Sequence, residues 1–243
     1  MRYKMTMAYD GRNYAGFQSQ INALAIQDVI EEKLEKIFGE KIRIVMSSRT
    51  DAGVHALDQV CHFDSDKKKD TYKLRFSLNS LLPKDIHILK IEEVDDSFHA
   101  RFSVKTKTYE YRINIGEYDV FLNGYAYQCF YKLDVELMKK AAKMYVGTHD
   151  FSSFNTSSFK EYPNQVRTIK QFKIMEKGDM LIIRVTGTGF LKNMVRIMVG
   201  TLIDLGRGKK KLEDVREMLE HPDKSKRRYN ADPNGLYLVK IRY

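Results

Sequence analysis

The feature that most constrains the fold is the order in which two apolar periodicities alternate along the first half of the chain. Strand-like alternation of apolar and polar residues is found over residues 2–9, 42–46, 58–63 and 86–94. Apolar residues recur instead at helical spacing over residues 26–38 and 72–82. The order strand, helix, two strands, helix, strand predicts an α+β fold in which helices cover one face of an antiparallel sheet.

A second series of elements follows a long polar connection that ends near residue 105. Strand patterns are found at residues 107–115, 125–130 and 180–188, with a further one opening at residues 164–169, and helical patterns at residues 134–145 and 190–202. The order of elements resembles that of the first half, although no residue-level repeat is visible. We therefore predict two domains, residues 1–105 and residues 106–243.

The chain is basic. Its 42 Lys and Arg residues exceed its 32 Asp and Glu residues by 10, and the isoelectric point is near 9.3. This surplus favours a polyanionic partner, although many basic proteins do not bind nucleic acid. Cationic runs lie at residues 67–69, 207–211 and 224–228. Each run is typical either of a solvated loop or of a contact with phosphates.

Cysteine usage and hydropathy indicate where the protein works. Cys61 and Cys129 form no CxxC pair and give no metal-ligand spacing, which predicts reduced thiols and no bound metal. No apolar run has the length of a signal peptide or of a membrane span. We therefore expect a soluble cytoplasmic protein without membrane contact.

An acidic residue lies in the connection between the strand patterns at 42–46 and 58–63. Asp51 follows Arg49 by two residues and is followed by Ala52 and Gly53. The arginine can hydrogen-bond the carboxylate and keep it ionised, and the small residues leave room for a nucleotide. The alternative for an isolated pair of this kind is a surface ion pair in a solvated turn.

The run from Arg49 to Ala56, Arg-Thr-Asp-Ala-Gly-Val-His-Ala, resembles the active-site signature of the TruA family of tRNA pseudouridine synthases. The family pattern begins with Gly where this chain has Ser48. The resemblance implies that Asp51 is the catalytic residue, and the position of Arg49 two residues earlier predicts that it supports the carboxylate.

Further blocks extend the resemblance over residues 9–238. Segment 14–20 resembles a family segment with Trp at the position of Phe17, and we predict that Tyr14 and Gln18 contact RNA. A core role is equally typical of the aromatic residues in this segment. Lys192 and Arg196 lie one helical turn apart in another matching block and are also predicted to contact RNA.

Segment 98–111 resembles the family's Phe-His-Ala-Arg-Phe-Ser block and the Tyr-x-Tyr that follows it. The resemblance implies that Tyr109 stacks on the target base. Lys105 and Lys107 share its strand face, which suits RNA phosphates beside a stacked base. The alternative is an aromatic pair between Tyr109 and Tyr111.

Two later positions complete the implied site. Arg167 matches an arginine that pairs with the catalytic carboxylate in the family, and Leu236 matches a leucine that packs against the target base. Asp232 and Pro233 depart from the family pattern shortly before Leu236.

The resemblance implies two similar RRM-like α/β sandwich domains that form an extended antiparallel sheet with a central active-site cleft. It further implies a homodimer that isomerises uridines 38–40 in the anticodon stem-loop of tRNA.

Breaking the C1′–N1 bond and rejoining uracil through C5 changes no oxidation state, so no cofactor is expected. A single carboxylate serves either as a nucleophile at C1′ or as a base, whereas a glycosidase normally uses two.

Two other functions remain compatible with these residues. The departures at Ser48, Phe17 and Asp232 leave room for a pseudouridine synthase that acts on ribosomal RNA. A noncatalytic RNA-binding protein can use the same sheet and the same basic runs.

Overall fold

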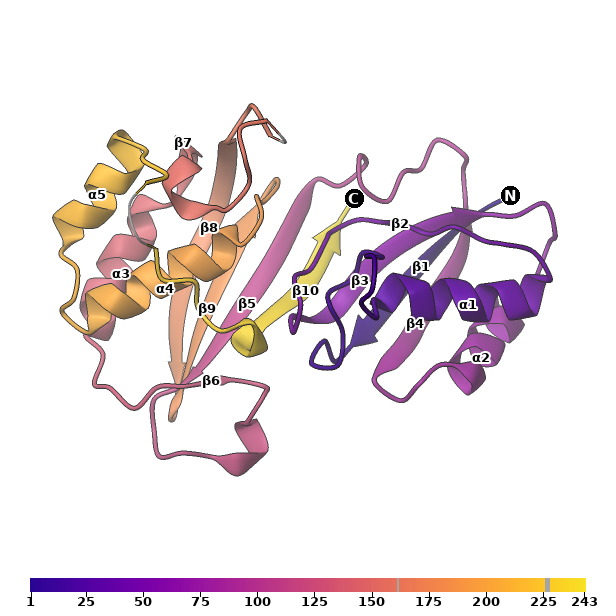
Figure 1. Ribbon diagram of the computed structural model, residues 1–243, viewed down its shortest axis with the longest axis horizontal. Coiled ribbons are helices and arrows are strands. Elements are labelled where there is room, and N and C mark those ends of the chain that lie inside the picture. Colours follow the sequence, from indigo (N-terminus) through magenta and orange to yellow (C-terminus); the bar gives the residue numbers. More distant parts are fainter. Residues whose placement is uncertain (161, 226–227) are drawn as a thin grey trace. The chain divides into compact units, whose positions relative to one another are not determined.

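A computed structural model describes residues 1–160, 162–225 and 228–243 of the chain. The chain forms two compact units, one of residues 1–105 with 237–243 and the other of residues 106–236 (Figure 1). The sequence division placed residues 237–243 with the second half, whereas they pack in the first unit. The reason is a strand pairing between residues 236–242 and residues 55–64, which the order of elements does not reveal.

The first unit is built on a sheet with the strand order β4-β1-β3-β10. Its strands are β1 (Arg2–Tyr9), β2 (Val45–Met46), β3 (His55–Asp64), β4 (Ile86–Val94) and β10 (Leu236–Arg242). The central strand β1 is antiparallel to both β3 and β4. In contrast to the antiparallel sheet expected, β10 runs parallel to β3. No hairpin joins these two strands, so a turn does not set their relative direction.

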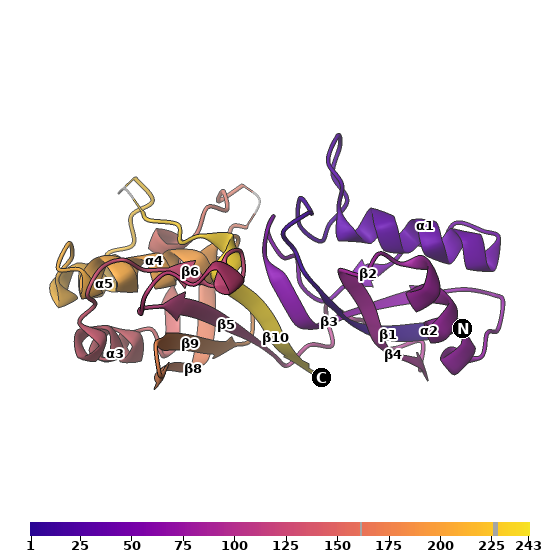
Figure 2. The same cartoon turned by 90° about the horizontal axis from the view of Figure 1, so that it is seen from below.

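Two helices complete this unit, α1 (Ile26–Phe38) and α2 (Thr71–Leu81). Figure 2 shows α1 lying over one face of the strands. The helix ends at Gly39, which is left-handed with φ 69° and donates its N–H to the Glu35 carbonyl at 2.8 Å. The Asp70 carboxylate begins α2 by accepting from the Lys73 N–H at 2.8 Å. Both predicted helices are confirmed.

The second unit has the strand order β5-β9-β8-β7, with antiparallel pairing along this path and β6 parallel to β5. Its strands are β5 (Thr106–Asn114), β6 (Tyr127–Gln128), β7 (Gly147–Asp150), β8 (Val166–Lys177) and β9 (Met180–Gly187). Its helices are α3 (Val135–Met144), α4 (Met194–Gly206) and α5 (Leu212–Glu220), with 3-10 turns η1 (Val120–Leu122), η2 (Ser152–Phe154) and η3 (Pro233–Gly235). Helix α3 packs against α4, α5 and β8.

Several element boundaries differ from the sequence expectations. The strand expected over residues 42–46 is reduced to β2, whose two residues pair with Cys61 and His62. The helix expected from residue 190 begins only at Met194, because Asn193 is left-handed with φ 60° and cannot continue a helix. Strand β7 and helix α5 were not predicted.

No helix within the described ranges combines the length and apolarity needed to cross a membrane.

The histidine His62 joins β3 to the loop of residues 95–103. Its side chain is buried, and its Nδ1 atom accepts the Ala100 N–H at 3.1 Å. Burial, with smaller contributions from Arg2 and His99, lowers its pKa from 6.5 to about 4. The folded protein therefore requires the neutral imidazole at this position.

A loss of stability in mild acid follows from His62. The folded state binds this proton less readily than the unfolded state, so the stabilisation is complete above pH 6.5 and is lost as the pH falls toward 4. The free energy of unfolding should drop by about 2 to 3 kcal/mol between pH 7 and pH 4.5 because of this residue alone. Urea unfolding of wild type and His62→Gln at both pH values checks this. An equal drop in both proteins would contradict it.

Candidate active site

The loop that carries Asp51 connects β2 to β3 in the first unit. Asp51 is partly exposed, whereas Thr50 before it and Val54 after it are buried, with exposed fractions of 7% and 1%. Arg49 is exposed. The loop thus has a buried base and presents its charged residues at the surface.

A buried hydrogen-bond network fixes the base of this loop. The hydroxyls of Tyr9 and Thr50 are 2.8 Å apart, and the Gln59 amide donates to the Ser48 carbonyl at 2.7 Å. The Ser47 hydroxyl donates to the Gln59 Oε1 at 2.8 Å. Buried polar groups that satisfy one another resist displacement, because breaking one bond leaves an unpaired buried group. The network therefore holds the loop in one conformation.

The segment that follows β1 packs its backbone directly against the loop. The Phe17 N–H donates to the Thr50 carbonyl at 3.2 Å, and the Gly53 N–H donates to the Tyr14 carbonyl at 3.4 Å. Gly16 has φ 101°, and a Cβ at this position would lie 2.6 Å from the Thr50 carbonyl oxygen. Glycine is required here both by its backbone conformation and by the approach of the Asp51 loop.

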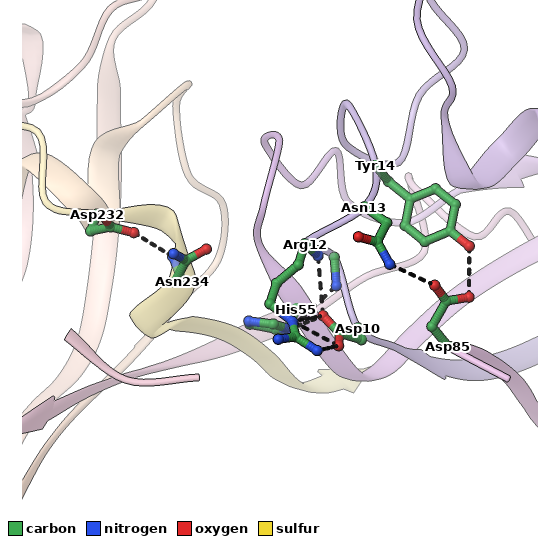
Figure 3. Close-up of polar contacts among 9 residues, drawn as sticks. Asp10, Arg12, Asn13, Tyr14, His55, Asp85, Asp232 and Asn234 are labelled. Atoms are coloured by element: carbon green, nitrogen blue, oxygen red, sulfur yellow. Dashed lines mark hydrogen bonds and ion pairs between the residues drawn. The ribbon is translucent and has the colours of Figure 1, made fainter. Parts of the chain in front are cut away.

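A polar cluster lies at the start of β3 (Figure 3). The Arg12 guanidinium binds the Asp10 carboxylate, with a shortest distance of 2.7 Å. The His55 Nδ1 lies 3.2 Å from the Gly11 N–H and 3.2 Å from the Asp10 carboxylate. The Nδ1 atom cannot both accept the Gly11 N–H and donate a proton to the Asp10 carboxylate. Because Arg12 already supplies donors to Asp10, we assign Nδ1 as the acceptor of the Gly11 N–H.

His55 also links the loop to the returning strand β10. Its ring stacks on the Tyr237 ring at a centroid distance of 4.6 Å and an interplanar angle of 19°. The two residues are paired in the parallel register of β3 and β10. The segment just after Asp51 is therefore held by both the residue 10–12 turn and the last strand.

Of the predicted RNA contacts in the first unit, Tyr14 is placed in the core. Its side chain is 6% exposed, and its hydroxyl donates to the Asp85 carboxylate at 2.7 Å (Figure 3). Burial and this hydrogen bond raise its pKa. The ring is not presented for stacking, so the structure favours the core alternative. Gln18 and Lys105 are exposed.

Two departures from the family signature have structural explanations. Ser48 is buried, and its φ is not positive, since Asn22 and Asn193 are the non-glycine residues of positive φ among those described. The backbone at position 48 therefore accepts a side chain without strain. Phe17 is fully buried with its ring 5.8 Å from that of Tyr9, so it is a core residue.

In the second unit, Tyr109 lies on β5 opposite Val185 and is 6% exposed. Its ring meets Phe190 edge to face at 5.1 Å and 82°. Phe190 is thus one ring partner of Tyr109. Lys107, two residues earlier on the strand, is partly exposed.

Arg167 opens β8 and is bound by carbonyl groups of its own segment. Its Nη1 donates to the Val166 carbonyl at 2.7 Å and to the Asn164 carbonyl at 3.0 Å. Burial lowers the pKa of its guanidinium. These contacts fix the direction of the side chain. Its predicted partnership with Asp51 stays a prediction.

The turn before Leu236 is held by Tyr111 and Arg196, for which the sequence had predicted other roles. The Tyr111 hydroxyl donates to the Asp232 carbonyl at 2.8 Å, and its ring packs so closely on Gly235 that a Cβ there would be 2.7 Å away. The Arg196 Nε donates to the Ala231 carbonyl at 2.7 Å. Arg196, predicted to contact RNA, therefore positions this segment. The sequence marked Tyr111 as part of the Tyr-x-Tyr block but gave no sign that its hydroxyl binds the Asp232 carbonyl.

The unusual Asp232 has a local structural role. Its carboxylate accepts the Asn234 N–H at 2.9 Å and so begins the turn η3 (Figure 3). Leu236, directly after this turn, is 4% exposed. The departure from the family pattern is thus compatible with a fixed Leu236.

Removing the Tyr111 hydroxyl should weaken this turn measurably. Tyr111→Phe leaves the Asp232 carbonyl without its donor and should lower the free energy of unfolding by about 1 kcal/mol. The matched control is Tyr145→Phe, because the buried Tyr145 hydroxyl has no hydrogen-bond partner among the described residues. Its removal should cost clearly less than removal of the Tyr111 hydroxyl, because the Thr201 side chain is near it but forms no hydrogen bond of normal geometry with it. Urea unfolding compares the two, and equal losses would count against the proposed anchor.

Two further sets of predicted RNA-contacting cations lie in the second unit, Lys192 and the run of residues 224–228. Lys192 is exposed immediately before α4. Lys224 contacts the Phe159 ring at 4.3 Å, and the Arg228 guanidinium donates to the Asn155 carbonyl at 2.6 Å. Both therefore contribute to packing within the second unit. Lys226 and Arg227, also in the predicted phosphate-contacting run, lie outside the described residues.

Comparison with known proteins gives consistent matches. A family described as tRNA pseudouridine synthase matches residues 5–103 and 141–243. The tRNA pseudouridine synthase A of Exiguobacterium sp. is 45% identical over 242 residues, covering 100% of this chain and 98% of the relative. That of Anoxybacillus flavithermus is 44% identical with the same coverage, and that of Wolbachia pipientis is 42% identical, with 100% of both chains covered.

Among solved structures, a Cbf5-Nop10-Gar1 complex aligns with 82% of this chain and 54% of its own. The identity is 12% and the TM-score is 0.34, which is too weak a likeness to support any conclusion.

Proposed function

This chain belongs to the tRNA pseudouridine synthase family and is an isomerase that converts uridine to pseudouridine in tRNA, and we propose that Asp51 is its catalytic residue. The observation that carries the proposal is the loop between β2 and β3. It presents Asp51, partly exposed, on a base fixed by buried hydrogen bonds to Tyr9 and Gln59. A reacting carboxylate has to be held in this way to meet the substrate in one geometry.

The reaction requires little more from the protein than this carboxylate and a base-binding pocket. The C1′–N1 bond breaks, the uracil turns, a C1′–C5 bond forms, and the C5 proton leaves while N1 gains one. Asp51 either attacks C1′ or takes up a proton during this sequence. Arg49, two residues away, supports the ionised form of the carboxylate.

The remaining site residues act on the same uridine in this proposal. Tyr109 stacks on the base, Leu236 packs against it, and Arg167 assists Asp51. Tyr109 and Leu236 are held in fixed positions by Phe190 and by the turn η3. Gln18, Lys105, Lys107 and Lys192 are at least partly exposed and contact the RNA around the target. An extruded nucleotide is held by such a combination of stacking and apolar contact.

The family resemblance supports finer statements about substrate and assembly. We propose that the two units are similar RRM-like halves, that uridines 38–40 of the anticodon stem-loop are the targets, and that the enzyme is a cytoplasmic homodimer. Sedimentation equilibrium should then give about twice the chain mass of 28.5 kDa. A mass of a single chain would contradict the dimer.

Mapping of pseudouridine in defined transcripts tests the function. Purified protein should introduce pseudouridine into an unmodified tRNA that carries uridines at positions 38–40, and not into the same tRNA with cytidines there. A ribosomal RNA fragment is the comparison substrate. Modification of that fragment and not of tRNA would favour the ribosomal alternative, and modification of neither would contradict the assignment.

A further inference from the structure

Phe102, in the loop of residues 95–103, is an exposed aromatic residue with no role in the site described above. Its side chain is 76% exposed, although Ala100 in the same loop is fully buried. Its ring lies 4.3 Å from that of His99, tilted by 32°, and the Arg101 guanidinium is 5.7 Å from the ring centroid. An imidazole, a phenyl ring and a guanidinium are thus gathered at one surface position.

The loop that presents this group is internally ordered. The His99 Nδ1 accepts the N–H groups of both Arg101 and Phe102, at 3.1 and 3.2 Å. The His99 N–H donates to the Ser103 hydroxyl at 3.0 Å, and the Ser103 N–H donates to the His99 carbonyl at 2.9 Å. The backbone beneath Phe102 is therefore a closed turn.

The same loop is also anchored to the sheet of the first unit. The Ala100 N–H donates to His62 on β3 at 3.1 Å, and the Tyr243 hydroxyl donates to the Ala100 carbonyl at 2.9 Å. The Arg2 guanidinium donates to the Phe98 carbonyl at 2.9 Å. Because the backbone is fixed in advance, a ligand that binds Phe102 need not order the loop.

We propose that Phe102, with His99 and Arg101, forms a stacking platform for one unpaired base of the RNA substrate. Bases stack on aromatic rings and on guanidinium planes, and an open ring beside a cation is suited to an unpaired nucleotide. The proposal rests on the tRNA substrate of the proposed function and adds a second subsite to it.

The platform binds a nucleotide other than the target uridine. His62, whose ring lies 4.8 Å from that of His99, is seven residues farther along β3 than His55. At about 3.3 Å per residue, this separates the platform from the Asp51 end of β3 by about 23 Å. One nucleotide cannot occupy both positions.

The test measures the affinity of the full-length protein for unmodified tRNA at several salt concentrations. Phe102→Ala should raise the Kd by about 5- to 100-fold without changing the slope of log Kd against log salt, because stacking neutralises no phosphate. Phe102→Trp should stay within about threefold of wild type, since the larger ring still stacks. The matched control is Phe76→Ala on α2, where the side chain is 71% exposed, and its Kd should not change.

Three results would overturn the platform. The first is an unchanged Kd for Phe102→Ala, and the second is an equal loss of affinity in Phe76→Ala. The third is a change in sedimentation mass for Phe102→Ala, which would identify Phe102 as a contact between copies of the chain. The proposed function is judged separately, because it is tested by pseudouridine formation in tRNA and by the Asp51→Asn variant rather than by tRNA affinity.

Discussion

Replacing Asp51 with Asn is expected to reduce the rate of pseudouridine formation by at least about 10³-fold in single-turnover experiments. The amide has the shape of the carboxylate but cannot attack C1′ or take up a proton at neutral pH. The loop itself should persist, because its base is held by Tyr9, Thr50 and Gln59 rather than by the carboxylate alone. Release of tritium from tRNA labelled at C5 of uridine measures the rate directly.

The same variant should retain tRNA binding, with a Kd within a few-fold of wild type. The matched control is Asp58→Asn in β3, a carboxylate of the same unit that accepts the Ile241 N–H at 2.9 Å and pairs with Lys240. Its removal should cost stability but leave turnover within a few-fold. Turnover by Asp51→Asn close to that of wild type would exclude Asp51 as the reacting group.

Replacing Gly16 with Ala should have a large effect, although Gly16 is not one of the predicted site residues. The methyl group meets the Thr50 carbonyl oxygen at 2.6 Å, in a backbone conformation of φ 101° that alanine avoids. Either the loop shifts and Asp51 is displaced, or the strain remains. We expect a loss of about 2 to 4 kcal/mol in the free energy of unfolding and a rate reduced by about 10² or more.

Gly178→Ala separates the cost of the left-handed backbone conformation from the cost of the close contact with the Thr50 carbonyl. Gly178 is also left-handed, with φ 56°, but no atom lies within 4 Å of a Cβ built there. The control should therefore lose only about 1 kcal/mol, from backbone strain, and keep its turnover. Urea unfolding and tritium release on both variants measure the difference. If Gly16→Ala resembles Gly178→Ala in both measurements, the close packing of the Asp51 loop is not needed for activity.

Sequence periodicity was most informative where one element buries a regular stripe of residues. Helix α1 has the predicted bounds, since Ile26, Ile30, Leu34 and Phe38 are buried on one face and Gly39 supplies the left-handed end. The position of Asp51 between two strands was also predicted, because the connection is short and lies between local patterns. Such features are determined by neighbouring residues.

Features that depend on residues far away in the sequence could not be predicted from local patterns. Strand β10 pairs with β3, in which Tyr237 lies beside His55, 182 positions earlier, and this pairing returns residues 237–243 to the first unit. The sequence pattern is compatible with Tyr14 either as a base contact or as a core residue. Its burial and its hydrogen bond to Asp85 favour the core. The role of Tyr111 depends on a carbonyl 121 positions away.

The central claim is that the chain modifies tRNA through Asp51, and a map of pseudouridines in cellular tRNA tests it most directly. Cells that lack the gene should lose pseudouridine at anticodon-arm positions, wild-type protein should restore it, and Asp51→Asn expressed at the same level should not. Restoration by Asp51→Asn, or an unchanged tRNA map in cells without the gene, would contradict the claim.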